Sequence, residues 1–141
     1  MTFQQIVSAA ILLILTAACA TAPRQNLFTA LGGEQGVVRL VDHMIESIGD
    51  DKQIFHYFAD TKISRFRQKL YLHLCQVSDG PCHYDGDSMI DVHTGMNINE
   101  GDFNHLVEIL IAAMDQEKLT QSTQNKLLKK LAPLRSEIIY Q

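Results

Sequence analysis

Apolar residues recur at helical spacing through the long segments of this chain, and no segment shows the alternation of apolar and polar residues that is typical of a strand. From residue 34 to residue 48 the apolar positions lie three or four apart, and the same spacing returns in residues 61–77, 99–114 and 120–138. A period of 3.6 residues places apolar side chains on one face of a helix. The sequence therefore predicts an all-α fold.

Turn and capping residues set the expected bounds of the first helices. Gly32-Gly33 marks a corner before the helix of residues 34–48, and Gly49 is expected to end it. A short helical piece follows at residues 51–58. Either Thr61 or Ser64 can cap the helix after that.

The second half of the chain carries similar signals. Asn99, with Asp102 three residues later, resembles a capping box in which Asp replaces the usual Glu. The last helix is expected to begin near Thr120. Pro133 lies inside this last helix and should bend it.

Length and charge limit the class of protein. A chain of 141 residues with 46% hydrophobic residues can form one domain with a single core. The net charge is −4 and no block of basic residues is present. These features argue against nucleic acid as a partner.

An apolar segment opens the chain. Residues 6–19 carry no charged side chain, and the first charged residue is Arg24. The segment has the length of a secretory signal and is short for a spanning helix, which needs ~20 apolar residues. It ends in small residues and Cys19, and it thereby resembles a bacterial lipoprotein signal, in which the cysteine is lipid-modified. We therefore expect an exported, periplasmic protein with a lipid anchor at Cys19.

The match to a lipoprotein signal is incomplete. Thr16 stands three residues before Cys19, where such signals usually have Leu, and residues 1–5 contain no Lys or Arg. Cleavage after Ala18 or Ala20 and an uncleaved anchor remain as alternatives. The expected domains are a signal at residues 1–18, a linker at 19–26 and a folded domain at 27–141.

Two cysteines remain if Cys19 is lipidated. Cys75 and Cys82 lie seven residues apart across an Asp-Gly-Pro turn. In an oxidising compartment a disulfide between them is the natural expectation. A zinc site is a poor alternative because the two cysteines and His83 do not have a standard zinc spacing.

His93 stands in an unusual local setting. A histidine by itself is most often a surface residue or a satisfied core residue. Here the turn Asp85-Gly86 leads into a short helical pattern that Asp87 can cap, and Gly95 stops the pattern just after His93. The apolar side of this short helix is formed by Met89, Ile90 and Val92.

This stretch resembles a known family. The pattern Tyr84-x-Gly86-x-x-Met89-x-x-x-His93, with Phe103 near the start of the next helix, is similar to the truncated haemoglobins, in particular their first group. The resemblance extends from about Leu27 to Ile139. Three further segments carry it, namely Leu27-Phe28-x-x-Leu31-Gly32-Gly33, Phe55-x-Tyr57-Phe58 and Leu131-Ala132-Pro133-Leu134-Arg135.

The resemblance implies a fold and a cofactor. It implies a two-over-two helical sandwich around a haem b, with His93 as the axial ligand of the iron. Covalent attachment through a C-x-x-C-H motif is excluded locally because Asp79 stands where a cysteine would be needed. The haem is therefore expected to bind non-covalently. The residues expected around it are Ile45, Phe58, Phe66, Lys69, Leu70, Tyr84, Met89, His93 and Phe103, with Lys69 pairing with a propionate.

The side of the haem opposite His93 departs from the family. Group 1 truncated haemoglobins usually place a Tyr on the second helix and a Gln or His on the third to hydrogen-bond the gas ligand. Ungapped matching from Phe58 places Ile45, Phe66 and Leu70 at those positions, and none of them can donate a hydrogen bond. Weak retention of dioxygen follows, since such a bond contributes ~1–3 kcal/mol.

Other side chains could become a sixth ligand of the iron. His73 lies one turn beyond Lys69, and His43 and Met44 precede Ile45 directly, so a shift of one residue would turn either inward. Tyr71 could turn inward under the same shift. A protein with such a sixth ligand would resemble a small electron-transfer cytochrome.

Three functions are compatible with these residues. The first is reversible binding of a diatomic gas, O2, NO or CO, at haem iron that an unidentified reductase keeps ferrous. The second is haem-based detoxification of NO or electron transfer in the periplasm. The third is a haem-free helical lipoprotein that serves as an interaction module. We expect a haem protein rather than an enzyme.

Overall fold

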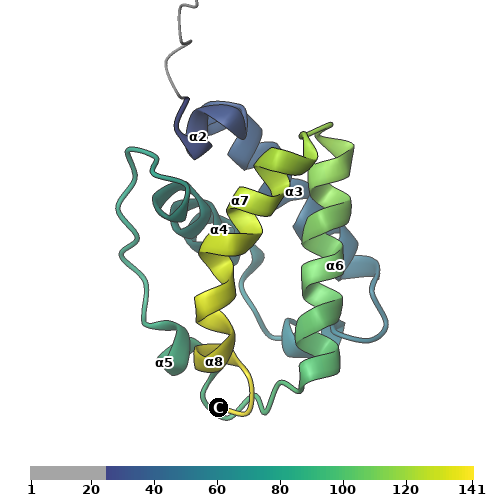
Figure 1. The fold of residues 1–141 in the computed structure, drawn as a ribbon. Coiled ribbons are helices and arrows are strands. Elements are labelled where there is room, and N and C mark those ends of the chain that lie inside the picture. The colour runs from purple at the N-terminus through teal and green to yellow at the C-terminus, as the bar shows by residue number, and fades with distance from the viewer. Residues whose placement is uncertain (1–24) are drawn as a thin grey trace, which may run out of the picture.

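The structure, a computed structural model, describes residues 25–141, and all of their regular secondary structure is helical (Figure 1). The expected signal, Cys19 and most of the linker lie outside these residues. The helices are α2 (Leu27–Ala30), α3 (Gly33–Asp50), α4 (Ile63–Val77), α5 (Met89–His93), α6 (Glu100–Gln116), α7 (Gln121–Leu131) and α8 (Arg135–Ile138), with the 3-10 turns η2 (Phe55–Tyr57) and η3 (Ala132–Leu134).

The long helices form two layers. α3 packs against both α4 and α6. α6 and α7 are joined by the turn at residues 117–120 and run in opposite directions (Figure 1). The pairs α3 with α4 and α6 with α7–α8 give the predicted two-over-two sandwich. Among residues 25–141, no helix is both long and apolar enough to cross a membrane.

The core lies where α3 crosses its neighbours. Val37 and Val41 of α3 are fully buried, as are Met114 of α6 and Leu127 of α7. These side chains fall on the apolar stripes that the sequence predicts, because a helix must bury one face against another element to be stable. The fold thus depends mainly on α3.

The corner before α3 requires its two glycines. Gly32 has φ +94° and Gly33 has φ +64°, a region that side chains with a Cβ disfavour. The turn brings Gly36 against the Leu31 carbonyl so closely that a Cβ at Gly36 would collide with it. The predicted corner is confirmed, and its tightness brings α2 onto α3.

Several helix bounds differ from expectation. α3 continues through Gly49 to Asp50, since a glycine in a helix costs only ~1 kcal/mol and tertiary packing outweighs that cost. Within residues 51–58, where a short helix was expected, only the 3-10 turn η2 forms. The Asp51 carboxylate accepts the backbone N–H groups of Gln53 (2.8 Å) and Ile54 (3.0 Å), which favours a turn over a helix.

The caps are partly as predicted. The Asn99 side chain accepts the Asp102 N–H at 2.9 Å, and Thr120 caps α7, as expected. Lys62 occupies the N-cap position of α4 without a side-chain hydrogen bond, so neither Thr61 nor Ser64 caps that helix. Pro133 does more than bend the last helix: it lies in the turn η3, which divides α7 from α8.

Candidate functional site

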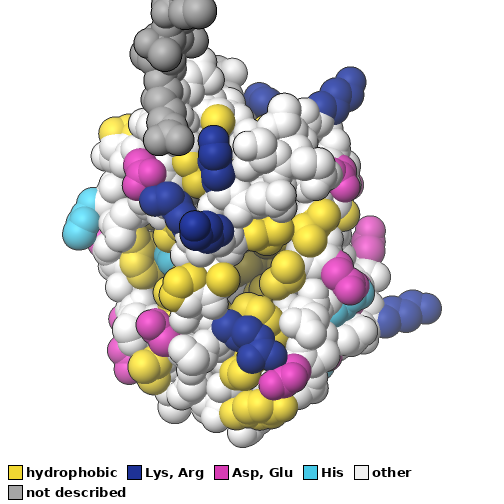
Figure 2. Space-filling view, viewed as in Figure 1, with side chains coloured by type: hydrophobic (Ala, Val, Ile, Leu, Met, Phe, Trp, Pro, Cys, Tyr) yellow, Lys and Arg dark blue, Asp and Glu magenta, His cyan; other side chains and the backbone are white. Residues whose placement is uncertain are grey.

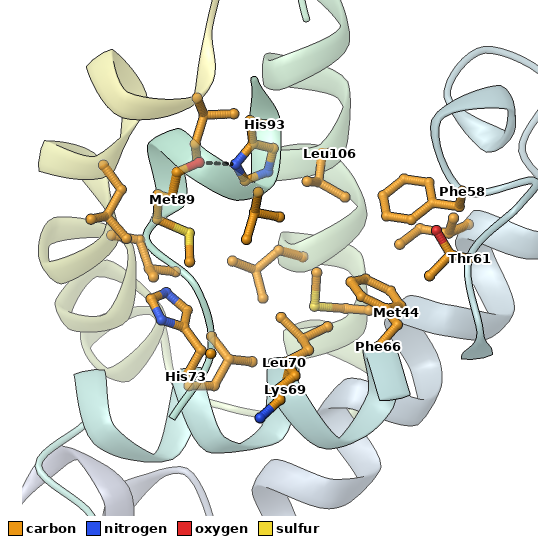
Figure 3. A pocket seen from close by; sticks show the side chains of 18 of the residues that line it. Met44, Phe58, Thr61, Phe66, Lys69, Leu70, His73, Met89, His93 and Leu106 are labelled. Atoms are coloured by element: carbon orange, nitrogen blue, oxygen red, sulfur yellow. Dashed lines mark hydrogen bonds between the residues drawn. The ribbon is translucent and has the colours of Figure 1, made fainter. Parts of the chain in front are cut away.

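A cavity of about 500 Å³ lies between the two layers (Figure 3). Its walls are mostly apolar and come from α3, α4, α5, α6 and the α7–α8 segment. The residues that form them include Met44, Ile48, Phe58, Phe66, Leu70, Leu74, Met89, Val92, Phe103, Leu106, Leu110, Leu131, Leu134 and Ile138, with the histidines His73 and His93. This is the size and character of a pocket for an apolar ligand of some hundreds of daltons.

His93 is held on α5, a helix of only five residues that lines the cavity. Ser88, and not Asp87 as the sequence suggested, caps α5, and its hydroxyl accepts the Asp91 N–H at 3.1 Å. A hydroxyl at this position can turn back to the helix N-terminus, while Asp87 lies one residue too early. The helix ends at His93, and Gly95 has φ +84°.

The His93 ring is fixed by a hydrogen bond within its own helix. Nδ1 lies 2.6 Å from the carbonyl oxygen of Met89, which is also visible in Figure 3. A carbonyl oxygen can only accept, so Nδ1 carries the proton. Nε2 then keeps its lone pair on the cavity side of the ring. This is the tautomer and orientation of a metal-binding imidazole.

Two phenylalanines form part of the wall. The rings of Phe58 and Phe66 are 5.1 Å apart between centroids and tilted by 48°. Met44 lies beside Phe66, and Leu106 lies across from Phe58 (Figure 3). These side chains would pack against the face of a flat apolar group bound in the cavity.

Cations gather where α4 borders the cavity. Lys62, Arg65 and Lys69 all line it. Lys69 donates from Nζ to the Asp85 carboxylate at 2.6 Å, and its side chain is 25% exposed. This hydrogen bond lowers the pKa of Asp85 below its usual value. The rim is thus able to pair with anionic groups of a ligand whose body is apolar.

The Tyr84-x-Gly86 pattern has a local cause. The Tyr84 ring folds over Gly86, and a Cβ on Gly86 would collide with that ring. The Tyr84 hydroxyl donates to the Asp87 carbonyl at 3.0 Å. The pair therefore shapes the loop that enters α5 and places Tyr84 on the cavity wall.

A second histidine borders the cavity. The His73 ring meets the edge of the Tyr84 ring at 5.4 Å between centroids. Burial lowers the pKa of His73. At neutral pH the ring is therefore an uncharged imidazole, which is the form that can bind a metal.

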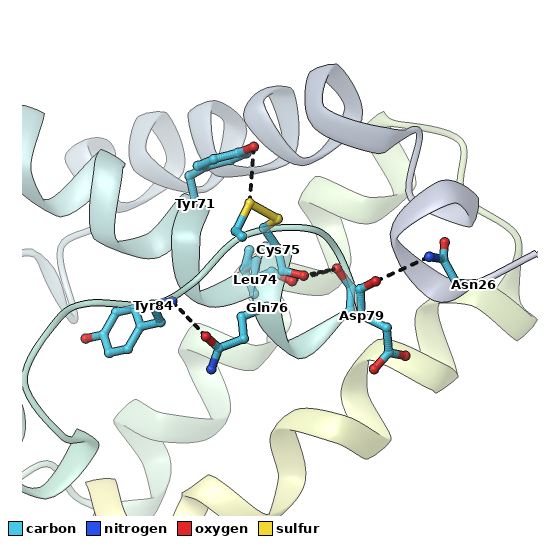
Figure 4. The surroundings of a disulfide bond; sticks show 9 residues. Asn26, Tyr71, Leu74, Cys75, Gln76, Asp79 and Tyr84 are labelled. Carbon is cyan, nitrogen blue, oxygen red and sulfur yellow. Dashed lines mark hydrogen bonds between the residues drawn. A yellow bond between two sulfur atoms is a disulfide. The ribbon is translucent and has the colours of Figure 1, made fainter.

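A disulfide anchors the loop between α4 and α5 (Figure 4). It joins Cys75, at the end of α4, to Cys82, as expected. The Tyr71 hydroxyl lies 3.5 Å from Cys82 Sγ, and the Gln76 side-chain oxygen accepts the Tyr84 N–H at 2.7 Å. The bond thus holds the loop that carries Tyr84 and Asp85 against α4.

Most of the predicted site residues converge on this cavity. Phe58, Phe66, Lys69, Leu70, Tyr84, Met89, His93 and Phe103 all line it. Ile45 does not: it is half-buried against the core, and Met44 lines the cavity instead. Met44 and Ile48 are four residues apart and share one face of α3, whereas Ile45 is turned about 100° away.

Other lining residues were not predicted. Ile48, Leu106 and Leu110 were not expected at the site, although all three lie on apolar stripes that the sequence predicts. Leu131, Leu134 and Ile138 lie on the apolar stripe of residues 120–138 and were likewise not predicted at the site. A stripe predicts which side chains are buried, but not which of them border a cavity.

Comparison with known proteins agrees with this geometry. The sequence profile of the bacterial-like globins matches residues 26–140. The chain belongs to the bacterial-like globin family. The globin is 25% identical over 115 residues to the group 1 truncated haemoglobin of Tetrahymena pyriformis, covering 82% of this chain and 95% of that protein. It is also 25% identical over 114 residues to the group 1 truncated haemoglobin GlbN of a Nostoc species, covering 81% and 97%.

Solved structures show the same fold. The crystal structure of the Fe(III) form of the Tetrahymena pyriformis protein superposes with a TM-score of 0.80 at 25% identity, covering 83% of this globin and 100% of that chain. The 2/2 haemoglobin of a Synechococcus species, in a structure with covalently attached haem, gives a TM-score of 0.77 at 16% identity, covering 82% and 98%. The predicted resemblance of this chain to the truncated haemoglobins is confirmed.

The residues of this globin fit a haem. A haem needs one strong axial ligand, an apolar slot for its ring and cations for its two carboxylates. His93 offers a free Nε2, the cavity walls are apolar, and Lys62, Arg65 and Lys69 line one side. Among residues 25–141, no three His, Cys, Asp or Glu side chains form a metal-binding group of their own.

Proposed function

We propose that this globin binds haem b non-covalently and takes up a diatomic gas reversibly at its iron. The observation that carries the proposal is the His93 ring, whose Nδ1–H is bound to the Met89 carbonyl at 2.6 Å and whose Nε2 faces an apolar cavity. Bound haem supplies an iron with an open position for a gas. The chain supplies the ligand, the orientation and the exclusion of water.

The cations of α4 would hold the two propionates. Lys69 is already bound to Asp85, so a propionate there would share Lys69 with that carboxylate. Arg65 lies one turn earlier on the same helix and borders the same cavity. Both side chains would fix the rotation of the ring and so the position of the iron over His93.

The wall away from His93 decides how long a gas stays bound. Met44, Phe66 and Leu70 supply no hydrogen-bond donor there. Dioxygen, which is held by such a bond in a polar pocket, should leave quickly. CO and NO depend less on that bond, and their binding should suffer less. The proposed gas is therefore CO or NO, and not stored dioxygen.

The test is spectroscopic. The purified chain, loaded with haemin and reduced, should give a five-coordinate ferrous spectrum and bind CO rapidly. His93→Ala should lose this spectrum, and His83→Ala, which changes an exposed histidine that does not line the cavity, should keep it. Failure of the wild-type chain to take up haem would contradict the proposal.

Electron transfer is the second candidate, and His73 favours it. Its uncharged imidazole borders the cavity and could become the sixth ligand of the iron. The ferrous spectrum would then be six-coordinate, and His73→Leu would convert it to five-coordinate. Rapid turnover of NO by the ferrous protein would instead favour NO detoxification.

The location of the globin is a further part of the proposal. Residues 6–19 support export, and Cys19 supports a lipid anchor on the periplasmic side of a membrane. The wild-type chain should then appear in the membrane fraction of an expressing bacterium. Cys19→Ala should release it or leave it unprocessed, and mass spectrometry of the N-terminal peptide distinguishes these results.

A further inference from the structure

A basic groove lies at the point where the described chain begins. Gln25, Asn26 and Leu27 form one side of it, and Lys126, Lys129 and Lys130 of α7 form the other, with Asp79 between them. Figure 2 shows Lys and Arg side chains gathered on the face next to this first described residue. α2 and α7 are in contact, so the groove is part of the fold and does not depend on a flexible arm.

The three lysines share one face of α7. Positions i, i+3 and i+4 of a helix are neighbours on its surface. All three side chains are exposed, while Leu127 between them is fully buried and anchors the opposite face. The helix therefore presents the lysines together to the surroundings of the protein.

The positive charge of this face is only partly compensated. Lys130 pairs with Asp79 at 2.9 Å. Within residues 25–141, no carboxylate lies within 4.0 Å of the Lys126 or Lys129 ammonium group. In a chain with a net charge of −4, two uncompensated lysines beside a third make this face unlike the average surface.

The apolar segment of the sequence lies close to this face along the chain. Cys19 precedes Asn26 by seven residues, a length that spans at most ~25 Å when fully extended. An anchor in residues 6–19, whether a lipid on Cys19 or the apolar segment itself, would hold Asn26 within that distance of the membrane. The lysines of the groove beside Asn26 would then lie close to the membrane surface.

We propose that Lys126, Lys129 and Lys130 form a membrane-facing surface that lies against anionic phospholipid headgroups. A lipid chain alone gives marginal binding, and a basic patch is the usual second signal. Lysines near an anionic bilayer add attraction that falls off within a Debye length. Such a surface would fix the orientation of the globin on the membrane. The proposal rests on the expected anchor and does not depend on bound haem.

The test uses the full chain in vesicles. Phosphatidylcholine vesicles and vesicles that also contain phosphatidylglycerol are treated with a water-soluble amine-acylating reagent, and acylation of each lysine is followed by mass spectrometry. Acylation of Lys126 and Lys129 should be about ten-fold slower with phosphatidylglycerol, since each lysine gains attraction at an anionic surface. Exposed Lys52 and Lys118 should react equally in both vesicles. Raising the salt to 1 M, where the Debye length is about 3 Å, should restore acylation.

Charge reversal provides the matched comparison. In Lys126→Glu/Lys129→Glu, acylation of the remaining Lys130 should no longer depend on phosphatidylglycerol. In Lys52→Glu/Lys118→Glu, which makes the same change in net charge, Lys130 should stay protected. Helical circular dichroism checks that each variant folds.

Two results of the vesicle experiment would overturn the proposal. One is equal acylation of Lys126 and Lys129 in both kinds of vesicle. The other is equal protection of Lys52, which would mean that the membrane shields the whole domain without a preferred face. Protection by inorganic phosphate in the absence of vesicles would assign the groove to a free anion and would also contradict the membrane surface. The acylation result does not depend on a haem spectrum. The membrane-facing surface and the binding of haem can therefore be contradicted separately.

Discussion

The His93 imidazole is bound to the Met89 carbonyl of its own helix, with Nδ1 and the oxygen 2.6 Å apart. Both residues belong to the same five-residue helix, so the hydrogen bond forms from local sequence alone. It selects the tautomer in which Nε2 is free and directs that atom into the cavity. The Met-x-x-x-His spacing thus has a physical meaning: it is the i to i+4 step that places the carbonyl under the ring.

Leu70→Gln should slow the release of dioxygen. Leu70 lines the cavity and supplies no donor, and a glutamine there would add an amide N–H worth ~1–3 kcal/mol, or about one to two decades in the dissociation rate. Stopped-flow measurement of dioxygen release from the reduced protein tests this. Leu70→Met, which keeps the wall apolar, is the control and should leave the rate unchanged. An unaltered rate in Leu70→Gln would show that residue 70 does not reach the gas.

Removing the disulfide should lower stability modestly. Closing so short a loop stabilises by ~2–3 kcal/mol in the chain-entropy model, so Cys75→Ser/Cys82→Ser should lose up to that amount. Urea unfolding of the variant and of the oxidised wild type measures the difference. Wild type under reducing conditions should unfold like the variant. Equal unfolding free energies in all three samples would count against the disulfide, and the haem spectrum should not change.

Stability should depend on pH through His105 and Asp51. His105 Nε2 lies 2.7 Å from the Asp51 carboxylate, and this hydrogen bond raises the pKa of His105 and lowers the pKa of Asp51. The His105 contribution is complete below its ordinary pKa of 6.5 and is lost as the pH rises through the higher folded value. The Asp51 contribution is present above 3.8 and is lost as the pH falls through its lower folded value.

The pair therefore contributes fully between these two limits. His105→Gln should lower the free energy of unfolding most near pH 5 and hardly at all near pH 9. Urea titrations across this range measure it, with exposed His83→Gln as the control. A loss in His105→Gln that stays constant from pH 5 to pH 9 would contradict this assignment.

The sequence predicted which segments form helices, but it could not predict how each helix is rotated about its own axis. The stripe on α3 was visible, yet a stripe about 100° wide does not say whether Met44 or Ile45 borders the cavity. That choice depends on how α3 rotates against α4 and α6. The capping prediction for Asn99 succeeded because the cap is local. The prediction of Asp87 as the cap of α5 failed because the helix begins one residue later than expected, at Met89, and Ser88 then occupies the N-cap position.

The cavity itself required the folded chain. His73 was noticed one turn after Lys69, but only the structure shows that it borders the same cavity as His93. Likewise, Leu131 and Ile138 share one apolar stripe in the sequence, and only the structure shows that both border the cavity, on either side of the turn η3 at Pro133. The position of His93 was predicted because its neighbours, Gly86 and Met89, act within a few residues of it.

The most direct measurement is a haemin titration of the purified chain, followed by absorption spectra of the ferric, ferrous and CO-bound forms. We expect one equivalent to bind, the ferrous form to be five-coordinate, and CO to bind to it. His93→Ala should lose this stable binding while it keeps most of its helical circular dichroism, and His83→Ala should behave as the wild type. Uptake of haem by His93→Ala with an unchanged spectrum would contradict the role of His93.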